Sequence, residues 1–129
     1  MTQEQKDLLL KDLCARLPYG VKFEHTDKHT LCEILSITPI YDYENVIYFN
    51  DYINHPKKCN IDDVKPYLFP LSSLTEEQRK EWQSLMIKDS YGILYYTVES
   101  YDYLYKNHFD YRGLIPMGLA IDATGLNIY

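Results

Sequence analysis

The N-terminal pattern of apolar and polar residues predicts a helix that begins after Thr2 and ends before Pro18. Thr2 and Gln5 have the spacing of a capping box, in which each side chain satisfies a backbone N–H at the start of a helix. Apolar residues then recur every three or four positions, which is typical of one buried helix face. That stripe consists of Leu9, Leu10, Leu13, Cys14 and Leu17. Asp12 lies off the stripe, and Gly20 follows Pro18 at the end of the helix.

The pattern then changes to alternation, which predicts an antiparallel meander of three strands. Apolar and polar residues alternate through 21–25, and residues 26–28 have the composition of a turn. Residues 30–38 are rich in β-branched and apolar side chains and predict the second strand. Residues 42–45 predict another turn, before a short third strand over 46–49.

The middle of the chain predicts a loop, a short strand and a second helix. Residues 51–60 form the most polar stretch and are expected to be an exposed loop. Residues 61–70 leave room for a short strand that ends before Pro66, because proline cannot donate to a strand ladder. Thr75 and Gln78 repeat the capping-box spacing. The helix that they begin has a predicted buried face made of Trp82, Leu85 and Met86.

The last third of the chain is rich in tyrosine, because seven of the fourteen tyrosines lie in residues 91–111. Residues 91–96 predict a strand, and residues 98–107 predict a helix with Thr97 as its N-cap. Helical spacing places on one face Val98, Tyr101, Leu104, Tyr105 and His108. Tyr103 falls on the opposite face, so we expect it to be an exposed aromatic side chain.

These elements predict an α+β fold in which a small antiparallel sheet of about three to four strands carries an N-terminal helix and two further helices packed on one face. No internal repeat, low-complexity run or linker divides the sequence, so residues 1–129 are expected to form a single domain. The predicted core consists of Leu9, Leu13, Phe23, Ile34, Ile37, Trp82, Leu85, Leu94, Tyr101 and Leu104.

Charge and composition exclude some classes of function. The chain carries 19 acidic and 13 basic side chains, a net charge of −6, whereas binding to duplex nucleic acid requires a basic face. The acidic balance fits a solvated surface, a basic protein partner or mimicry of nucleic acid. No apolar run approaches the length of a membrane span. A polar N-terminus without a signal region and an odd number of cysteines predict reduced thiols in a cytoplasmic protein.

Histidine and cysteine residues raise the question of a zinc site, because zinc takes nitrogen and sulfur ligands. The residues concerned, in the spacings H-x3-H-x2-C and H-x3-C, are His25, His29, Cys32, His55 and Cys59. No C-x2-C knuckle is present, and a predicted turn separates the first two histidines. An odd offset also points His29 and Cys32 to opposite faces of a strand. We therefore expect no metal site here and a small buried thiol at Cys32.

The segment 108–112 (HFDYR) is the densest cluster of reactive side chains in the sequence. His108 beside Asp110 could serve as a general base, since a carboxylate can orient an imidazole. Arg112 could hold a phosphate or carboxylate through its planar guanidinium. The same residues also suit a structural role, in which Asp110 caps a turn and a buried polar cluster fixes the last helix against the sheet. Structure, ligand binding and catalysis remain open alternatives for this segment.

Three segments carry a resemblance to other proteins. They are Lys11–Lys22 (KDLCARLPYGVK), Ile61–Glu77 (IDDVKPYLFPLSSLTEE) and Asn107–Ala120 (NHFDYRGLIPMGLA). These segments resemble a group of small proteins of unknown function from gut anaerobic bacteria and their phages and mobile elements. The resemblance implies the setting of a bacterial or phage accessory protein. It implies no activity, ligand or functional residue.

The sequence contains no P-loop, dinucleotide-binding, HExxH, GxSxG or EF-hand motif, and we expect no cofactor. The leading hypothesis is a non-enzymatic binding or accessory protein. It would act on a protein partner, or on a second copy of itself, through a tyrosine-rich acidic surface. The candidate binding residues are Tyr101, Tyr103, His108, Asp110, Tyr111 and Arg112. The alternative is a small hydrolase or phosphate-ligand-binding enzyme that uses His108, Asp110 and Arg112.

Overall fold

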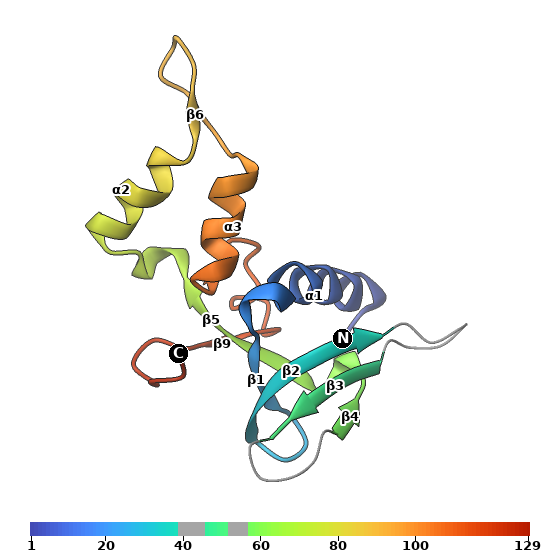
Figure 1. The fold of residues 1–129 in the computed structure, drawn as a ribbon. Helices are drawn as coiled ribbons and strands as arrows, with labels where there is room; N and C mark the ends of the chain where they lie inside the picture. The colour runs from blue at the N-terminus through green and yellow to red at the C-terminus, as the bar shows by residue number, and fades with distance from the viewer. Residues whose placement is uncertain (39–45, 52–56) are drawn as a thin grey trace.

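The computed structural model describes residues 1–38, 46–51 and 57–129 (Figure 1). The turn predicted over 42–45 and the candidate ligand His55 lie outside these residues. The described helices are α1 (Gln3–Arg16), α2 (Glu76–Ser84) and α3 (Val98–Lys106), with short 3-10 helices η1 (Leu17–Tyr19), η2 (Ile61–Asp63) and η3 (Leu71–Ser73). The described strands are β1 (Lys22–His25), β2 (Thr30–Thr38), β3 (Val46–Asn50), β4 (Lys57–Cys59), β5 (Val64–Pro70), β6 (Ile87–Lys88), β7 (Leu94–Tyr95), β8 (Phe109–Asp110) and β9 (Ile121–Asp122). None of the described helices has the length and apolar character needed to cross a membrane.

The α-helices begin where their capping residues predict. The Thr2 hydroxyl accepts a hydrogen bond from the Gln5 N–H at 3.1 Å, and the Gln5 side chain accepts one from the Thr2 N–H at 3.0 Å. α2 and α3 begin with the same reciprocal arrangement at Thr75 and Thr97. These side chains satisfy N–H groups that have no partner within the helix. Local sequence therefore determines the start of each helix.

The sheet is larger than predicted and is mixed rather than antiparallel. Its seven described strands run in the order β4-β3-β2-β1-β5-β8, and β9 also pairs with β5. The predicted meander over β1, β2 and β3 is confirmed as antiparallel, but β8 and β9 pair parallel to β5. The prediction of about three to four antiparallel strands was wrong, because strands of two residues show too little alternation to be recognised in sequence.

The polar stretch 51–60 was predicted to be an exposed loop; residues 52–56 of it lie outside the described residues, and Lys57–Cys59 form β4. This strand pairs antiparallel with β3 and stands last in the described strand order. Two of its three residues are Lys57 and Lys58. Lysine is common on edge strands, where its charge discourages pairing with another chain. The lysines therefore mark a sheet edge.

β5 continues through Pro66, although the sequence predicted a strand that ends before it. Pro66 is paired with Phe23 of β1. The carbonyl of Leu68 accepts a hydrogen bond from the Ala123 N–H on the β9 side, and backbone groups two residues apart point to the same side of a strand. The proline nitrogen therefore faces the β9 side, where pairing begins only at Tyr67. No ladder hydrogen bond is lost at this position.

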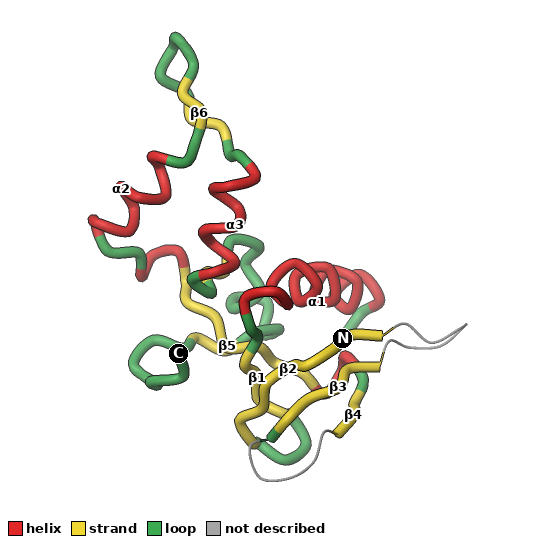
Figure 2. Tube along the Cα trace, in the orientation of Figure 1, coloured by secondary structure: helices red, strands yellow, loops and turns green. Residues whose placement is uncertain are grey.

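Buried apolar residues form two clusters rather than one. The larger cluster lies between α1 and the sheet and includes Leu9, Leu13, Phe23, Ile34, Ile47 and Leu68. The second cluster joins α2 and α3 to β8 and consists of Leu74, Trp82, Leu104 and Phe109. α2 and α3 therefore pack at β8, at one end of the sheet, whereas the sequence predicted two further helices packed on one face of it. With the β6–β7 hairpin they form an extension beyond one end of the sheet (Figures 1 and 2).

The predicted core residues divide between the body and this extension. The buried ones are Leu9, Leu13, Phe23, Ile34, Trp82 and Leu104. Ile37 and Tyr101 are partly buried, whereas Leu85 and Leu94 are exposed. The two exposed leucines lie at or in the projecting hairpin.

We expect Trp82→Ala to lower the free energy of unfolding by about 3–5 kcal/mol, since the indole is 6% exposed and fills the second cluster. Its Nε1 also donates to the Ser100 carbonyl at 3.2 Å. Urea denaturation followed by circular dichroism measures the change. Gln83→Ala, on the exposed side of α2, is the matched control and should change stability by less than about 0.5 kcal/mol. Equal stabilities of the two variants would contradict the packing described for α2.

Candidate functional site

A buried carboxylate between two guanidinium groups lies where α1, β8 and the segment after β8 meet. Asp12 is fully buried and accepts hydrogen bonds from Arg16 Nε at 2.7 Å and from Arg112 Nε at 3.0 Å. Arg16 is also fully buried, and its Nη2 donates to the Phe109 carbonyl at 2.6 Å. Attraction between the carboxylate and the two guanidinium groups offsets the cost of removing these charges from water. These contacts join segments that are far apart in the sequence.

Two tyrosines extend this arrangement, which we call the Asp12 network (Asp12, Arg16, Tyr105, Tyr111 and Arg112). Arg112 Nη2 donates to the Tyr105 hydroxyl at 3.3 Å, and the hydroxyls of Tyr105 and Tyr111 are 2.7 Å apart. The Arg112 guanidinium lies 4.8 Å from the centroid of the Tyr111 ring, a cation–π contact. Burial, and then the hydrogen bond with Tyr105, raise the pKa of the Tyr111 hydroxyl far above its ordinary value. Tyr111 and Arg112, both candidate binding residues, are therefore engaged inside the protein.

Asp110 caps the turn that follows β8. Its carboxylate oxygens accept hydrogen bonds from the N–H groups of Leu114 and Ile115, both at 2.9 Å. Asp110 is buried, so these two bonds offset the loss of its hydration. The carboxylate thus holds the C-terminal segment in place. Asp110 and Arg112 point to different partners, and the convergence with His108 that the hydrolase alternative requires is not found.

His108 is held in an unusual backbone conformation beside a pocket. Its φ is 65°, in the left-handed region that few side chains adopt, and its ring stacks on Tyr129 with centroids 3.5 Å apart. Burial, and then the nearby charges of Arg16 and Lys22, lower the pKa of His108 from 6.5 to about 4. Its Nδ1 is buried and has no hydrogen-bond partner. The imidazole is therefore neutral at pH 7.

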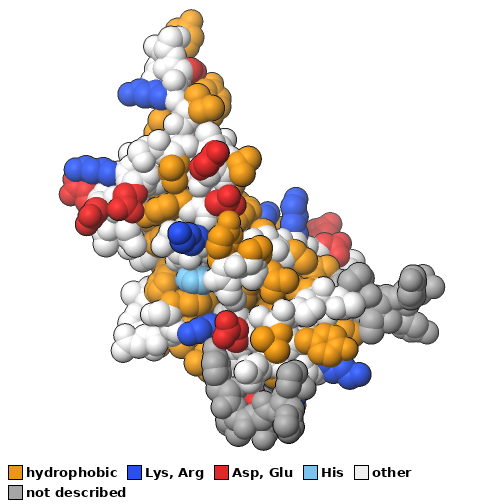
Figure 3. Space-filling view, in the orientation of Figure 1, with side chains coloured by type: hydrophobic (Ala, Val, Ile, Leu, Met, Phe, Trp, Pro, Cys, Tyr) orange, Lys and Arg blue, Asp and Glu red, His pale blue; other side chains and the backbone are white. Residues whose placement is uncertain are grey.

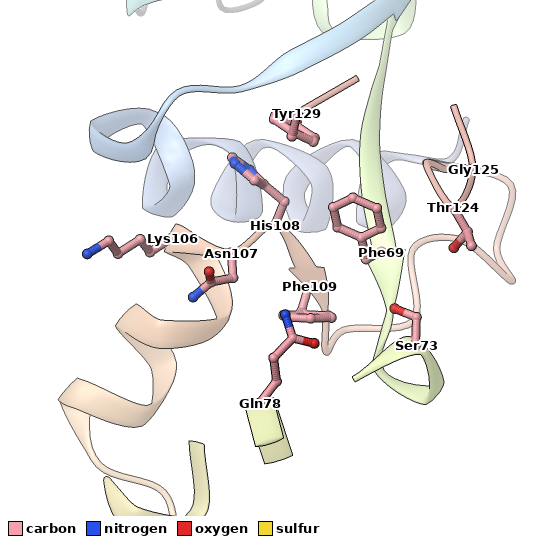
Figure 4. Close-up of a pocket in the computed structure, with 10 residues that line it drawn as sticks. All are labelled: Phe69, Ser73, Gln78, Lys106, Asn107, His108, Phe109, Thr124, Gly125 and Tyr129. Atoms are coloured by element: carbon pink, nitrogen blue, oxygen red, sulfur yellow. The ribbon is translucent and has the colours of Figure 1, made fainter. Parts of the chain in front are cut away.

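The pocket beside His108 has a volume of about 490 Å³. Its polar lining includes Ser73, Gln78 and Asn107, and its apolar lining includes Phe69 and Phe109. Figure 4 shows the Lys106 side chain extending away from the other labelled side chains. A phosphate group needs positive charge directed at it, and here the imidazole is neutral and the ammonium points elsewhere. Among the labelled lining residues, none directs a positive charge into the pocket.

The hairpin formed by β6 and β7 is organised by Asp89. One carboxylate oxygen accepts hydrogen bonds from the N–H groups of Tyr91 at 2.9 Å and Ile93 at 3.0 Å, and the other accepts one from the Tyr95 hydroxyl at 3.0 Å. These hydrogen bonds, that of Ile93 first, lower the pKa of Asp89. Gly92 has a φ of 84°, which its lack of a Cβ permits. The turn has a defined shape although it is surrounded by solvent.

Apolar and aromatic side chains cover this hairpin and face solvent. The exposed set, which we call the hairpin surface, consists of Ile87, Tyr91, Ile93, Leu94, Tyr95, Tyr96 and Val98. Tyr91 is 89% exposed and Ile87 is 63% exposed. In the space-filling view, hydrophobic side chains are visible at the projecting end of the molecule (Figure 3). Exposed apolar side chains gathered on one part of a protein surface are typical of a site that contacts another molecule.

The tyrosines of α3 are more buried than the sequence predicted for Tyr103. Tyr103 was predicted to be exposed but is half-buried, because α2 packs beside it and its hydroxyl donates to Glu81 at 3.0 Å. Burial, and then this hydrogen bond, raise the pKa of Tyr103 to about 12. Tyr101 is also half-buried, with its ring centroid 5.3 Å from those of both Tyr96 and Tyr111. A series of ring contacts therefore runs from the hairpin to the Asp12 network.

The histidines and cysteines considered as zinc ligands from the sequence are only partly brought together in the structure. His25 and Cys59 lie close to each other and to Asp63, and one ligand atom from each lies within 4.8 Å of the others. His29 is exposed and its Nδ1 lies 3.7 Å from Glu24. Cys32 is buried as predicted, with its Sγ 3.6 Å from the Thr30 hydroxyl.

Sequence reasoning missed Asp12 and Arg16, which were not among the candidate residues. Their spacing of four residues on a helix is the usual signal for a side-chain ion pair, but it does not reveal burial. Asp63 was also missed as a neighbour of His25. The adjacent Asp62 has a different partner, since it pairs with Lys6 at 3.2 Å.

No protein-family model matches the chain, and no curated protein or solved structure matches it significantly. Function is therefore inferred from the geometry and chemistry of the chain's own residues.

We expect Asp12→Asn to lower the free energy of unfolding by about 3–5 kcal/mol, because it leaves the buried Arg16 guanidinium without a compensating charge. Asp7→Asn, which removes one exposed carboxylate from the same helix, should change stability by less than about 0.5 kcal/mol. Thermal and urea unfolding of both variants give the comparison. A destabilisation of Asp12→Asn no larger than that of the control would contradict a central role for the network.

The low pKa of His108 predicts a loss of stability in acid. The unfolded chain binds a proton at this residue below about pH 6.5, whereas the folded chain does so only near pH 4. Folding stability therefore falls as the pH falls between these values, by about 1–2 kcal/mol once solvent screening of the half-buried ring is allowed for. His108→Asn removes the titrating ring while tolerating the left-handed backbone, so its stability should depend less on pH. Gln83→Ala, which removes no titratable group, should keep the wild-type dependence in urea titrations. An equal pH dependence of stability in His108→Asn and Gln83→Ala would contradict this role of His108.

Proposed function

We propose that the protein is a non-enzymatic accessory protein that binds a protein partner through the hairpin surface. The observation that carries this proposal is the solvent exposure of seven apolar or aromatic side chains on the β6–β7 hairpin and at the start of α3. Tyrosine and isoleucine of this kind contribute large contact areas at interfaces. The bacterial or phage setting and the cytoplasmic location expected from the sequence belong to the same proposal.

The fixed shape of the hairpin supports binding rather than random exposure. A two-stranded hairpin alone is marginally stable in water. Here the Asp89 carboxylate holds the turn, and the Tyr96 ring packs on Trp82 at a centroid distance of 5.4 Å. The Thr97 hydroxyl also donates to the Leu85 carbonyl at the base of the hairpin. An element ordered before binding loses less entropy when a partner docks.

Charge favours one kind of partner. Residues 76–106 contain six acidic and four basic side chains, and the whole chain carries a net charge of −6. Glu99 and Asp102 are exposed on α3, close in sequence to the hairpin. A protein with an apolar groove bordered by basic side chains matches both features. A second copy of this acidic chain fits less well, since like charges would meet.

The enzyme alternative is less well supported. Of the three residues that it requires, only His108 lines the pocket. Asp110 is occupied as a turn cap and Arg112 is paired with Asp12. A hydrolase also needs a nucleophile or an activated water beside its base, and no described residue in the pocket lining forms such a pair with His108.

The proposal predicts that Tyr91→Ser/Ile93→Ser weakens partner binding while leaving the fold intact, because both side chains are exposed. The partner is first identified by photo-crosslinking from position 91 in the native cytoplasm. Its affinity for purified wild type and variants is then measured by calorimetry. We expect the Kd of the double variant to be higher than that of wild type by about tenfold or more.

Tyr48→Ser is the matched control, because Tyr48 is an exposed tyrosine on β3, away from the hairpin. It should bind with wild-type affinity, and crosslinks from position 48 should not enrich the same protein. An unchanged Kd for the double variant would contradict the proposal. Crosslinks only to a second copy of the chain, or to nothing beyond the position-48 background, would also contradict it.

A further inference from the structure

Three segments of the chain bring a nitrogen, a sulfur and an oxygen ligand together at one end of the sheet. His25 is the last residue of β1, Cys59 is the last residue of β4, and Asp63 is the last residue of η2. A ring nitrogen of His25, the Cys59 Sγ and an Asp63 carboxylate oxygen all lie within 4.8 Å of one another. Cys59 and Asp63 bracket the short crossover from β4 to β5, in the spacing C-x3-D.

Backbone hydrogen bonds hold these segments in place. The Thr26 N–H, next to His25, donates to the Asp63 carbonyl at 3.0 Å. Within the crossover the Asp63 N–H donates to the Asn60 carbonyl at 3.1 Å, and the Asn60 side chain accepts from the Asp62 N–H at 2.9 Å. The three side chains therefore start from fixed backbone positions, which lowers the cost of assembling a site.

His25 has a buried polar atom without a partner. The residue is 8% exposed, and its Nδ1 has no hydrogen-bond partner. Buried polar atoms in folded proteins nearly always have a partner, because an unpaired one costs free energy. The ring is packed against Phe49, with centroids 5.5 Å apart. An imidazole placed in this way is suited to coordinate an ion.

We propose that His25, Cys59 and Asp63 bind a zinc ion. Imidazole nitrogen, thiolate sulfur and carboxylate oxygen are the ligand types that zinc takes, and magnesium and calcium prefer oxygen alone. Ligand atoms around tetrahedral zinc lie roughly 3.3–3.8 Å apart, so side-chain movements of about 1 Å close the site. Cys59 and Asp63 are only partly buried, which leaves the fourth position to water.

Zinc in this position links the sheet edge to the crossover. β1 is separated from β4 in the sheet by β2 and β3, and Asp63 immediately precedes β5. Bonds from one ion to His25, Cys59 and Asp63 join β1, β4 and η2 at this end of the sheet. The metal then stabilises the folded chain by an amount that grows with the logarithm of free zinc concentration over Kd, because the unfolded chain does not hold the three ligands together.

The test uses the purified full chain under reducing conditions, with Zn²⁺ and Co²⁺ as probes. Competition with a chromogenic chelator gives the stoichiometry and affinity for zinc, and thermal unfolding gives the stabilisation. Co²⁺ bound by a thiolate shows a charge-transfer absorption in the near ultraviolet. We expect one zinc ion per chain, a higher Tm with zinc, and a cobalt–thiolate band.

Four variants separate this site from adventitious binding. Cys59→Ser and Asp63→Asn should each weaken zinc binding by about tenfold or more, and Cys59→Ser should lose the cobalt–thiolate band. Cys14→Ser and His29→Asn remove an exposed cysteine and an exposed histidine and should bind as wild type. Asp63→Asn is nearly isosteric, so it remains informative if Cys59→Ser folds poorly. Equal zinc affinity in Asp63→Asn and wild type, or a cobalt spectrum without a thiolate band, would overturn the proposal.

Discussion

The Asp12 carboxylate is the contact on which the arrangement of the chain depends. It lies fully buried between the guanidinium groups of Arg16 and Arg112, which come from positions 96 residues apart in the sequence. A buried charge is costly unless it is paired, so the folded chain brings the three groups together. Because Arg16 also binds the Phe109 carbonyl, α1 fixes the position of β8. This contact thereby helps to hold the extension made by α2 and α3 in place relative to the sheet.

This anchoring explains why the extension can carry exposed apolar residues. Its own cluster around Trp82 and Leu104 is small, but its base is joined to the body by the polar network and by β5. A projecting element that is held at its base keeps its shape in solvent. The body of the protein thus serves as a support for the hairpin. The segment 108–112, which the sequence marked as a cluster of reactive side chains, belongs to that support, with Asp110 and Arg112 both occupied by structural contacts.

The features that depend on neighbouring residues could be predicted from the sequence. Thr2, Thr75 and Thr97 begin helices because their capping contacts lie within three residues. Alternation identified β1, β2 and β3 for the same reason. The features that could not be predicted depend on distant residues. Asp12 is buried with Arg112 beside it, and Tyr103 is half-buried because α2 and its residue Glu81 lie beside it.

The candidate functional residues show the same difference between what neighbouring residues and what distant residues determine. Residue types alone drew attention to His25 and Cys59 but gave no reason to join them to Asp63. The contact between Trp82 and Tyr96 has a further consequence, because Trp82 is the chain's single tryptophan. Its indole stands at the foot of the hairpin and has its own fluorescence. Any event that displaces Tyr96 changes the surroundings of this one fluorophore, so the unlabelled protein carries an optical reporter of what happens at its projecting tip.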